Sequence, residues 1–479
     1  MTTVQARDGD LSRSIKSARR DQTRREIQRL LDALAAWEER WEKLDQYASQ
    51  LSAVCAEVRG AAAVISSQIS SLGAGDSTGS VFAGCSRCDR QIAWLWRVFG
   101  FFRDKFNQRG DPEFGATVAA ADEVVWSCYK PFFRKTLSSR RPPAPLPFIA
   151  PEYSPAAVRR DQTPESLIET NSEFEPLRNW FRNLPIPILK LPPSTVTAPW
   201  SMILVGHEIG HFIQPLVQPD FAFVAEFRQR VEDAVTAAGG TVEEAACWGG
   251  WAPEIFADWY SVVTMGPWAV WMMAQLELDE PTRMLTRRAE YPSPLARMAL
   301  LGALADALVA GSGTALLIEL GLDIADLLRL HPEDADLTQV APIAKSITAP
   351  LPDGIGRLDE ILFFRAANYS AGGEVDLWAK ALVADPEPTA KMDIRAARLA
   401  TAGCGKACWQ AMKIADEKRR QKHEKNLGRT AGVIAACAEP GKRAAVAAPS
   451  PRSSPGTELA ALLGDLDAAT DRHAPALSR

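Results

Sequence analysis

A regular pattern of apolar positions runs through the N-terminal part of the chain. Apolar residues recur at alternating steps of three and four, and charged residues such as Glu38 and Glu39 fill the faces between them. This period is that of a heptad seam, which predicts a long amphipathic helix within residues 1–80. The seam consists of Ile27, Leu30, Leu34, Trp37, Trp41, Leu44, Ala48, Leu51, Cys55, Val58, Ala62, Ile65, Ile69 and Leu72.

The partner that buries this seam is left open by the pattern, because two packing schemes satisfy it. The seam can fold back on a helical region predicted at residues 81–140, which gives an intramolecular bundle. It can also pack on a second copy of the chain, or on another protein, as a coiled coil does. Both schemes predict a helical N-terminal part.

Beyond the seam, the pattern predicts a mainly α chain with few strands. A proline-rich stretch at residues 141–164 is typical of a linker, and a compact region follows at 165–300. More helices are predicted for residues 301–437. The Ala/Pro/Ser-rich composition of residues 438–479 favours a disordered tail.

Composition and charge exclude several classes of protein. The 479 residues are 47% hydrophobic and 24% charged, and the net charge of -5 gives no basic footprint for nucleic acid. A start without an apolar signal run, and eight dispersed cysteines, favour a cytosolic protein with reduced thiols. The composition is also typical of a bacterium. An uncharged run at 259–276 has the length of a membrane span, but Gly266 and Pro267 interrupt it, so we expect a broken, buried helix.

The stretch "GHEIGH" at residues 206–211 has the pattern of a catalytic metal site. A helix places residues i and i+4 on one face, so His207 and His211 can direct imidazole nitrogens at one cation. Glu208 lies beside His207, within reach of a water molecule on that cation. Zinc lowers the pKa of such a water towards about 7, and the carboxylate removes its proton as the water attacks a carbonyl carbon.

A catalytic zinc site of this kind needs a third protein ligand, and "WGGWAPEIFADWYS" at 248–261 offers one. Pro253 opens a helix there, with Glu254 in its first turn and Asp258 one turn later. We expect Glu254 to complete the site and Asp258 to accept the free ring N–H of a histidine ligand. The rival carboxylates are Glu226, Glu232, Glu243 and Glu244, and the histidines expected at the surface are His331, His423 and His473.

These two motifs resemble those of the gluzincins, the branch of the zincin metallopeptidases that pairs H-E-x-x-H with a downstream E-x-x-x-D helix. The resemblance implies a Zn²⁺ ion held by His207, His211 and Glu254. It also implies that Glu208 is the general base and that Asp258 orients a histidine. The implied activity is hydrolysis of a peptide bond in a protein or peptide substrate, by a zincin-like core flanked by the N-terminal and C-terminal helices.

Such enzymes also stabilise the oxyanion that forms opposite the metal. In "AEYPSPLARMALL" at 289–301, Tyr291 and Arg297 resemble a H-P-x-x-x-x-R segment of some zincins, with Tyr291 in the place of the histidine. Tyr291 is therefore a candidate for this role and Tyr260 an alternative, while Arg297 can instead pair with a carboxylate of the site. The resemblance also implies an edge strand that binds substrate, and "IPILKL" at 186–191 fits, because its prolines confine it to an edge.

Two cysteine pairs have spacings that suit a second zinc site. Cys85 and Cys88 have the spacing of a zinc knuckle, and Cys404 and Cys408 lie one helical turn apart. The simpler interpretation is that all four are small buried side chains. The sequence alone does not show whether the two pairs meet.

Three functions are consistent with these residues. The first is a zinc-dependent endopeptidase of a bacterial cytosol, which the presence of the general base Glu208 favours. The second is a helical scaffold or regulatory protein whose zincin domain binds zinc or peptide without turnover. The third is a protease effector of a bacterial toxin or defence system.

Overall fold

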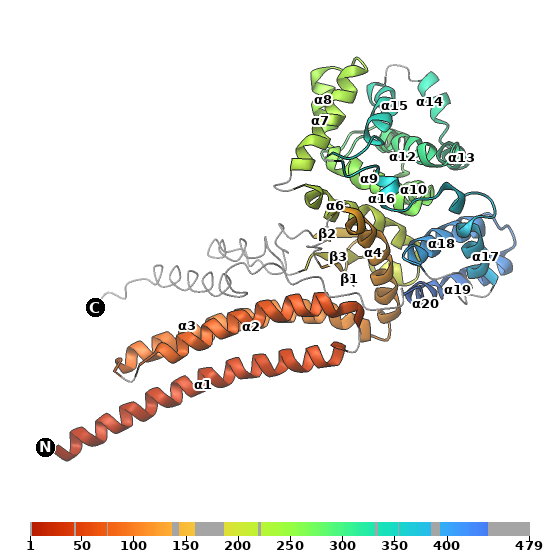
Figure 1. Cartoon of the computed structure of the whole chain (residues 1–479). Coiled ribbons are helices and arrows are strands. Elements are labelled where there is room, and N and C mark those ends of the chain that lie inside the picture. Colours follow the sequence, from red (N-terminus) through yellow and green to blue (C-terminus); the bar gives the residue numbers. More distant parts are fainter. Residues whose placement is uncertain are drawn as a thin grey trace.

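The computed structural model shows a mainly helical chain, as predicted, with three short strands among the described residues (Figure 1). It describes residues 2–438 except for 43–44, 74, 137–142, 159–185, 219–221, 331–333, 353 and 385–392. The tail predicted at 438–479 therefore lies almost wholly outside the described residues. No described helix combines the length and the apolarity that a membrane crossing requires.

Three N-terminal helices form an arm that projects from the rest of the molecule (Figure 1). They are α1 (Thr2–Glu42), α2 (Ala48–Ser71) and α3 (Thr78–Asn107), with the short 3-10 helix η1 (Asp45–Tyr47) before α2. We predicted one long helix for the seam, and this prediction is wrong, because the seam is divided between α1 and α2. The chain is held in a turn at Tyr47, because its hydroxyl donates a hydrogen bond of 2.8 Å to Asp122 outside the arm.

The apolar seam is buried inside this arm. The seam residues with no exposed surface include Leu30, Leu34, Val58 and Ile65. They belong to one core that α1, α2 and α3 share. The ring of Phe106 on α3 contacts those of Trp37, Trp41 and Tyr47 edge-on, at centroid distances of 5.1–5.4 Å. The intramolecular bundle is therefore the scheme that the structure shows for this seam, while association with a second chain or another protein stays a prediction.

A three-stranded sheet lies where the arm meets the rest of the chain (Figure 1). It consists of β1 (Leu146–Ile149), β2 (Ala156–Val158) and β3 (Ile188–Leu191) in the order β1-β3-β2. Strand β3 pairs with β1 in parallel and with β2 in antiparallel register. The segment "IPILKL" is thus the central strand, not the predicted edge, because Pro187 precedes the paired residues and removes no N–H from them.

The edge strand β2, together with β1, comes from the segment that we predicted as a linker at 141–164. That prediction is wrong for 146–149 and 156–158, which the sheet orders. Successive side chains of a strand point to opposite faces. Accordingly, Phe148 and Ile188 pack on the core of the arm, while Ile149 and Leu189 pack on the larger core behind the sheet.

The larger core contains residues from most of the remaining described helices. The α4 helix (Gly115–Thr136) belongs to it, although we predicted that residues 81–140 would pack on the seam. The C-terminal helices predicted for 301–437 are present. The other elements are η2 (Gln108–Gly110), η5 (Pro193–Val196), η6 (Pro199–Leu204), α6 (Val205–Val217), α7 (Ala222–Ala237), α8 (Val242–Gly250), α9 (Ala252–Met265), α10 (Trp268–Glu277), α11 (Pro281–Met284), α12 (Pro294–Leu308), α13 (Ser312–Glu319), α14 (Ile324–Leu330), α15 (Ala335–Ile347), α16 (Leu358–Ile361), η8 (Ala366–Asn368), α17 (Glu374–Ala384), α18 (Ala396–Met412), α19 (Glu417–Leu427) and α20 (Thr430–Ala436).

The apolar run at 259–276 is a broken, buried helix, as predicted. The α9 helix ends at Gly266, whose φ of 63° suits glycine, and Pro267 starts the turn into α10. A side chain at Gly266 would also collide with the ring of Tyr369, at 2.3 Å. Most residues of the run are buried in the larger core, which explains their lack of charge.

Candidate metal centre

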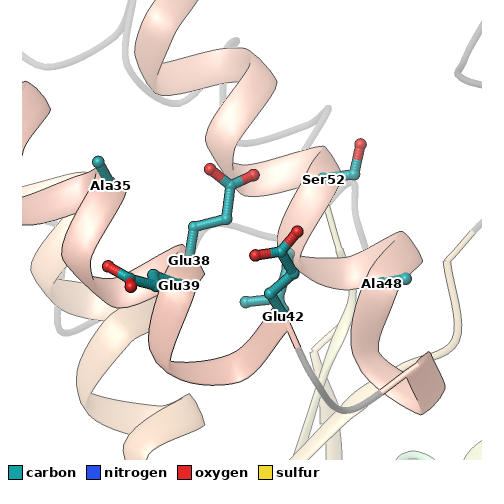
Figure 2. A pocket seen from close by; sticks show the side chains of 7 residues that line it. Ala35, Glu38, Glu39, Glu42, Ala48 and Ser52 are labelled. Carbon is teal, nitrogen blue, oxygen red and sulfur yellow. The ribbon is translucent and has the colours of Figure 1, made fainter.

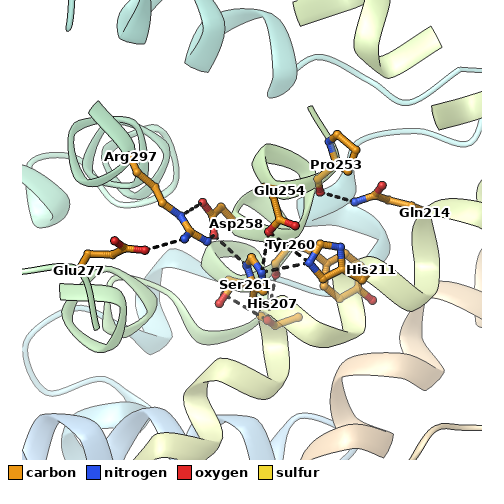
Figure 3. A network of polar contacts seen from close by, with 11 residues as sticks. His207, His211, Gln214, Pro253, Glu254, Asp258, Tyr260, Ser261, Glu277 and Arg297 are labelled. Atoms are coloured by element: carbon orange, nitrogen blue, oxygen red, sulfur yellow. Dashed lines mark hydrogen bonds and ion pairs between the residues drawn. The ribbon is translucent and has the colours of Figure 1, made fainter. Parts of the chain in front are cut away.

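Two closely packed helices, α6 and α9, carry the three predicted metal ligands together with Glu208 and Asp258 (Figure 3). Two glycines of "GHEIGH" set their separation. A Cβ at Gly206 would lie 2.5 Å from Thr264 Oγ1, and one at Gly210 would lie 2.7 Å from the Cα atom of Ala257. Only a residue without a side chain permits this approach. It brings the first turn of α9, and with it Glu254, to the two histidines of α6.

His207, His211 and Glu254 converge at one point (Figure 3). The two Nε2 atoms lie 3.1 Å apart, and Glu254 Oε2 lies 3.2 Å from that of His207 and 3.3 Å from that of His211. The three atoms thus form a nearly equilateral triangle. Among the described residues, no other cluster of His, Cys, Asp and Glu brings three ligand atoms together in this way.

The electronic character of these atoms favours a cation between them. Asp258 Oδ1 lies 2.8 Å from His207 Nδ1 and accepts its N–H, which leaves Nε2 of the neutral ring with a lone pair. Glu254 Oε2 is buried, and no described group other than the two imidazoles is placed to donate a hydrogen bond to it. Acceptors that face one another in a buried site are costly unless a positive charge lies between them. These residues therefore fit a divalent metal ion.

The close approach of these groups also shifts the pKa values of His207 and Glu254. Burial lowers the pKa of the His207 imidazole, but Asp258 and Glu254 raise it to about 10. Burial raises the pKa of Glu254, yet the two imidazoles outweigh it and hold that pKa well below its ordinary value. The metal-free centre thus retains a proton on the His207 imidazole. A metal ion would replace this proton, because only the deprotonated ring can bind it.

Glu208 lies next to His207 and is buried. The backbone N–H of Ala157, in the edge strand β2, donates a hydrogen bond of 2.7 Å to Glu208 Oε2. This bond fixes the carboxylate and leaves its other oxygen to exchange a proton. Burial raises the pKa of Glu208 above its ordinary value. A raised pKa is what a carboxylate needs to act as a general base near neutral pH.

A buried network of ion pairs and hydrogen bonds orients His207 through Asp258 (Figure 3). Arg297 donates from Nε and Nη2 to the two oxygens of Asp258, at 2.8 and 2.9 Å. Its Nη1 donates to Glu277 Oε1 at 2.8 Å. Burial raises the pKa of Asp258, but Arg297 and His207 reverse this and keep it ionised. Arg297 thus pairs with a site carboxylate, the alternative that we named for it.

The two candidate tyrosines differ in their surroundings. Tyr260 is fully buried and its hydroxyl donates to the carbonyl oxygen of Cys128 at 2.8 Å. That bond holds its hydroxyl within the core, so Tyr260 does not fit the role of oxyanion stabiliser. Tyr291 is half-buried, and the guanidinium of Arg297 lies over its ring, 4.4 Å from the centroid. Burial, with Glu254 nearby, raises the pKa of Tyr291, so its hydroxyl keeps its proton.

The rival ligands lie elsewhere. Glu226 and Glu232 pair with arginines on α7, Glu244 caps the first turn of α8, and none of these joins the cluster. Glu243 is exposed in the same turn. His331 and His473 lie outside the described residues, and His423 lies on α19, outside the cluster.

The two cysteine pairs do not form a second metal centre. Cys85 and Cys88 are buried on α3 of the arm, while Cys404 and Cys408 belong to the larger core. They are small buried side chains, as the simpler interpretation had it.

A pocket between the end of α1 and the start of α2 is also separate from the histidines (Figure 2). Its lining is acidic, with Glu38, Glu39 and Glu42 from α1.

Sequence reasoning missed four residues that contribute to the centre, Glu277, Ala157, Gly206 and Gly210. Glu277 ends α10 directly after the uncharged run, and its burial has no signal in the local sequence. Ala157 acts through its backbone, which no side-chain motif reveals. Gly206 and Gly210, in contrast, have a visible signal. Two glycines four residues apart in an apolar helix lie on one face and indicate close helix packing.

Comparison with known proteins adds no assignment. No family model, no curated protein and no solved structure matches this chain. The centre therefore has to be interpreted from its own geometry.

Proposed function

We propose that this chain is a zinc-dependent endopeptidase of the gluzincin type. One observation carries the proposal, the triangle of ligand atoms with sides of 3.1–3.3 Å. Two atoms bound about 2.0–2.1 Å from a tetrahedral zinc ion lie about 3.3 Å apart. The spacing of His207, His211 and Glu254 therefore suits zinc, with a fourth position left for water or substrate.

When held by His207, His211 and Glu254, zinc would supply an activated water and would polarise the carbonyl group of the substrate. Glu208 takes the proton of that water and passes it to the nitrogen of the leaving amine. The hydrogen bond from Ala157 holds Glu208 in place for both transfers. Asp258 keeps His207 oriented, and Tyr291 is the residue available to donate to the oxyanion.

The sheet favours an extended peptide as the substrate. The outer edge of β1 is occupied, because the side-chain amide of Gln108 exchanges two hydrogen bonds, of 2.7 and 3.0 Å, with the backbone of Ile149. The described part of β2 is paired only with β3, and β2 contacts Glu208. The Ala157 N–H of β2 already donates to Glu208, so a peptide that adds to β2 would bind through the remaining backbone groups of its outer edge and would pass the general base. Strand addition needs no chain end, which favours internal bonds.

Cleavage of a peptide library by zinc-loaded protein tests this function. Glu208→Gln removes the base but no zinc ligand, so we expect the zinc content to stay and the rate to fall by about 10²–10⁴-fold. Glu226→Gln, an exposed change on α7, is the matched control and should cleave like wild type. Equal cleavage by wild type and Glu208→Gln would exclude the proposed mechanism.

A further inference from the structure

Glu277 is a buried carboxylate with an unfavourable local position. It is the last residue of α10 and is only 4% exposed. The C-terminus of a helix carries a partial negative charge, so a buried glutamate there needs cations nearby. Two arginines meet this need. Arg297 donates to its Oε1 at 2.8 Å and Arg288 to its Oε2 at 2.6 Å.

The two arginines belong to different parts of the centre. Arg297 is buried on α12 and holds Asp258, which accepts the ring N–H of His207. Arg288 lies in the loop of residues 285–293 between α11 and α12, and its side chain is 46% exposed. Glu277 therefore links this surface loop to a metal-ligand histidine through an unbroken series of ion pairs and hydrogen bonds.

The same loop carries Tyr291. The backbone N–H of Arg288 donates to the carbonyl oxygen of Tyr291 at 3.1 Å, which closes the loop on itself. The Tyr291 ring lies against the guanidinium of Arg297. A second anchor, between Arg287 and Asp336 of α15, holds the loop at 2.8 Å from a different side. This second anchor does not contact the histidine network.

We propose that Glu277 is a positioning residue that couples the loop of residues 285–293 to His207, so that zinc binding and closure of the loop strengthen each other. The inference rests on the proposed metal centre. Glu277 shares the charge of Arg297, and this sharing leaves Asp258 free to accept from His207. It also holds Arg288, and with it the segment that brings Tyr291 to the centre. Loss of Glu277 would leave both arginines without this partner.

The test compares zinc affinity, by chelator competition, with hydrogen exchange of peptides covering 285–293, with and without zinc. In the full wild-type chain we expect zinc to slow exchange of the loop. Replacement of a residue that orients a ligand lowers metal affinity by about 10–100-fold, and we expect about tenfold for Glu277→Gln. Binding linkage is reciprocal, so zinc should slow opening of the wild-type loop by a similar factor.

Two further variants separate coupling from simple loss of structure. Arg288→Gln, a change at a half-exposed side chain, should abolish the effect of zinc on loop exchange and lower zinc affinity by the same factor. Asp336→Asn releases the other anchor, so exchange should rise in both states while zinc affinity stays within about twofold and zinc still slows exchange. Equal zinc affinity in wild type, Glu277→Gln and Arg288→Gln would overturn the coupling while leaving the metal centre in place. Wild type that binds no zinc would overturn both.

Discussion

The arm and the metal centre bury their residues for opposite reasons. In the arm, apolar side chains such as Leu34 and Phe106 are removed from water, and each finds apolar partners within the same bundle. In the centre, two imidazoles and a carboxylate are brought together with their acceptor atoms facing one another. The first region is complete as it stands, since burial of apolar area stabilises it. The second has the geometry of a site that could hold a cation, and this difference is the reason for placing the proposed function there.

The largest expected effect lies in the centre, for Glu254→Gln. Apparent binding free energies of about 10–16 kcal/mol for four-ligand zinc sites suggest about 3–4 kcal/mol for each ligand. We therefore expect zinc affinity to fall by about 10²–10³-fold. Chelator competition measures this change. The control is Glu244→Gln in the first turn of α8, which should bind zinc as wild type does.

A change in the arm should give a loss of stability and no loss of metal. Phe106 contacts three aromatic rings and is 1% exposed, so Phe106→Ala should cost about 3–5 kcal/mol in the free energy of unfolding. Guanidinium unfolding followed by tryptophan fluorescence measures it. Phe82→Ala, at an exposed ring on α3, should cost less than about 0.5 kcal/mol. A large loss of zinc affinity in Phe106→Ala would show that the two regions are not independent.

A smaller effect on zinc affinity is expected for Asp258, which accepts the ring N–H of His207. Asp258→Asn keeps the size of the side chain but removes the charge that His207 and Arg297 share. Zinc affinity should fall by about 10–100-fold, as for other residues that orient a histidine ligand. Isothermal titration measures it, with Asp279→Asn, an exposed change, as the control. An unchanged affinity would show that Asp258 does not orient the ligand.

The smallest pair of effects compares one helix glycine from each region. At Gly210 an added Cβ would lie 2.7 Å from Ala257, so Gly210→Ala should cost about 1–3 kcal/mol by overpacking. At Gly100 on α3 nothing lies within 4 Å of the same position, so Gly100→Ala should stabilise by about 0.5–1 kcal/mol. Thermal unfolding measures both. Two shifts of the same sign would contradict the close packing of α6 on α9.

Much of this arrangement could be predicted from local patterns. The heptad period gives the burial of Leu30 and Ile65, and the broken helix at Gly266 follows from its flanking proline. The convergence of His207, His211 and Glu254 follows from helix geometry and ligand chemistry. These features depend on residues a few positions apart, or on residue types that need one another, so one sequence contains them.

Contacts between distant segments could not be predicted. The turn at Tyr47 depends on Asp122, and the sheet order depends on strands 156–158 and 188–191 meeting across a long separation in sequence. The burial of Glu277 depends on arginines from two other segments. In each case the energy comes from partners that the local pattern does not contain, so the pattern favours a continuous helix, a linker or a solvent-exposed charge instead.

The zinc content of purified wild type and His211→Ala, measured by mass spectrometry, tests the proposed metal centre most directly. The geometry of the three ligand atoms predicts roughly one zinc ion per chain in wild type and almost none in the variant. The same zinc content in both proteins would place the metal elsewhere and contradict the central claim.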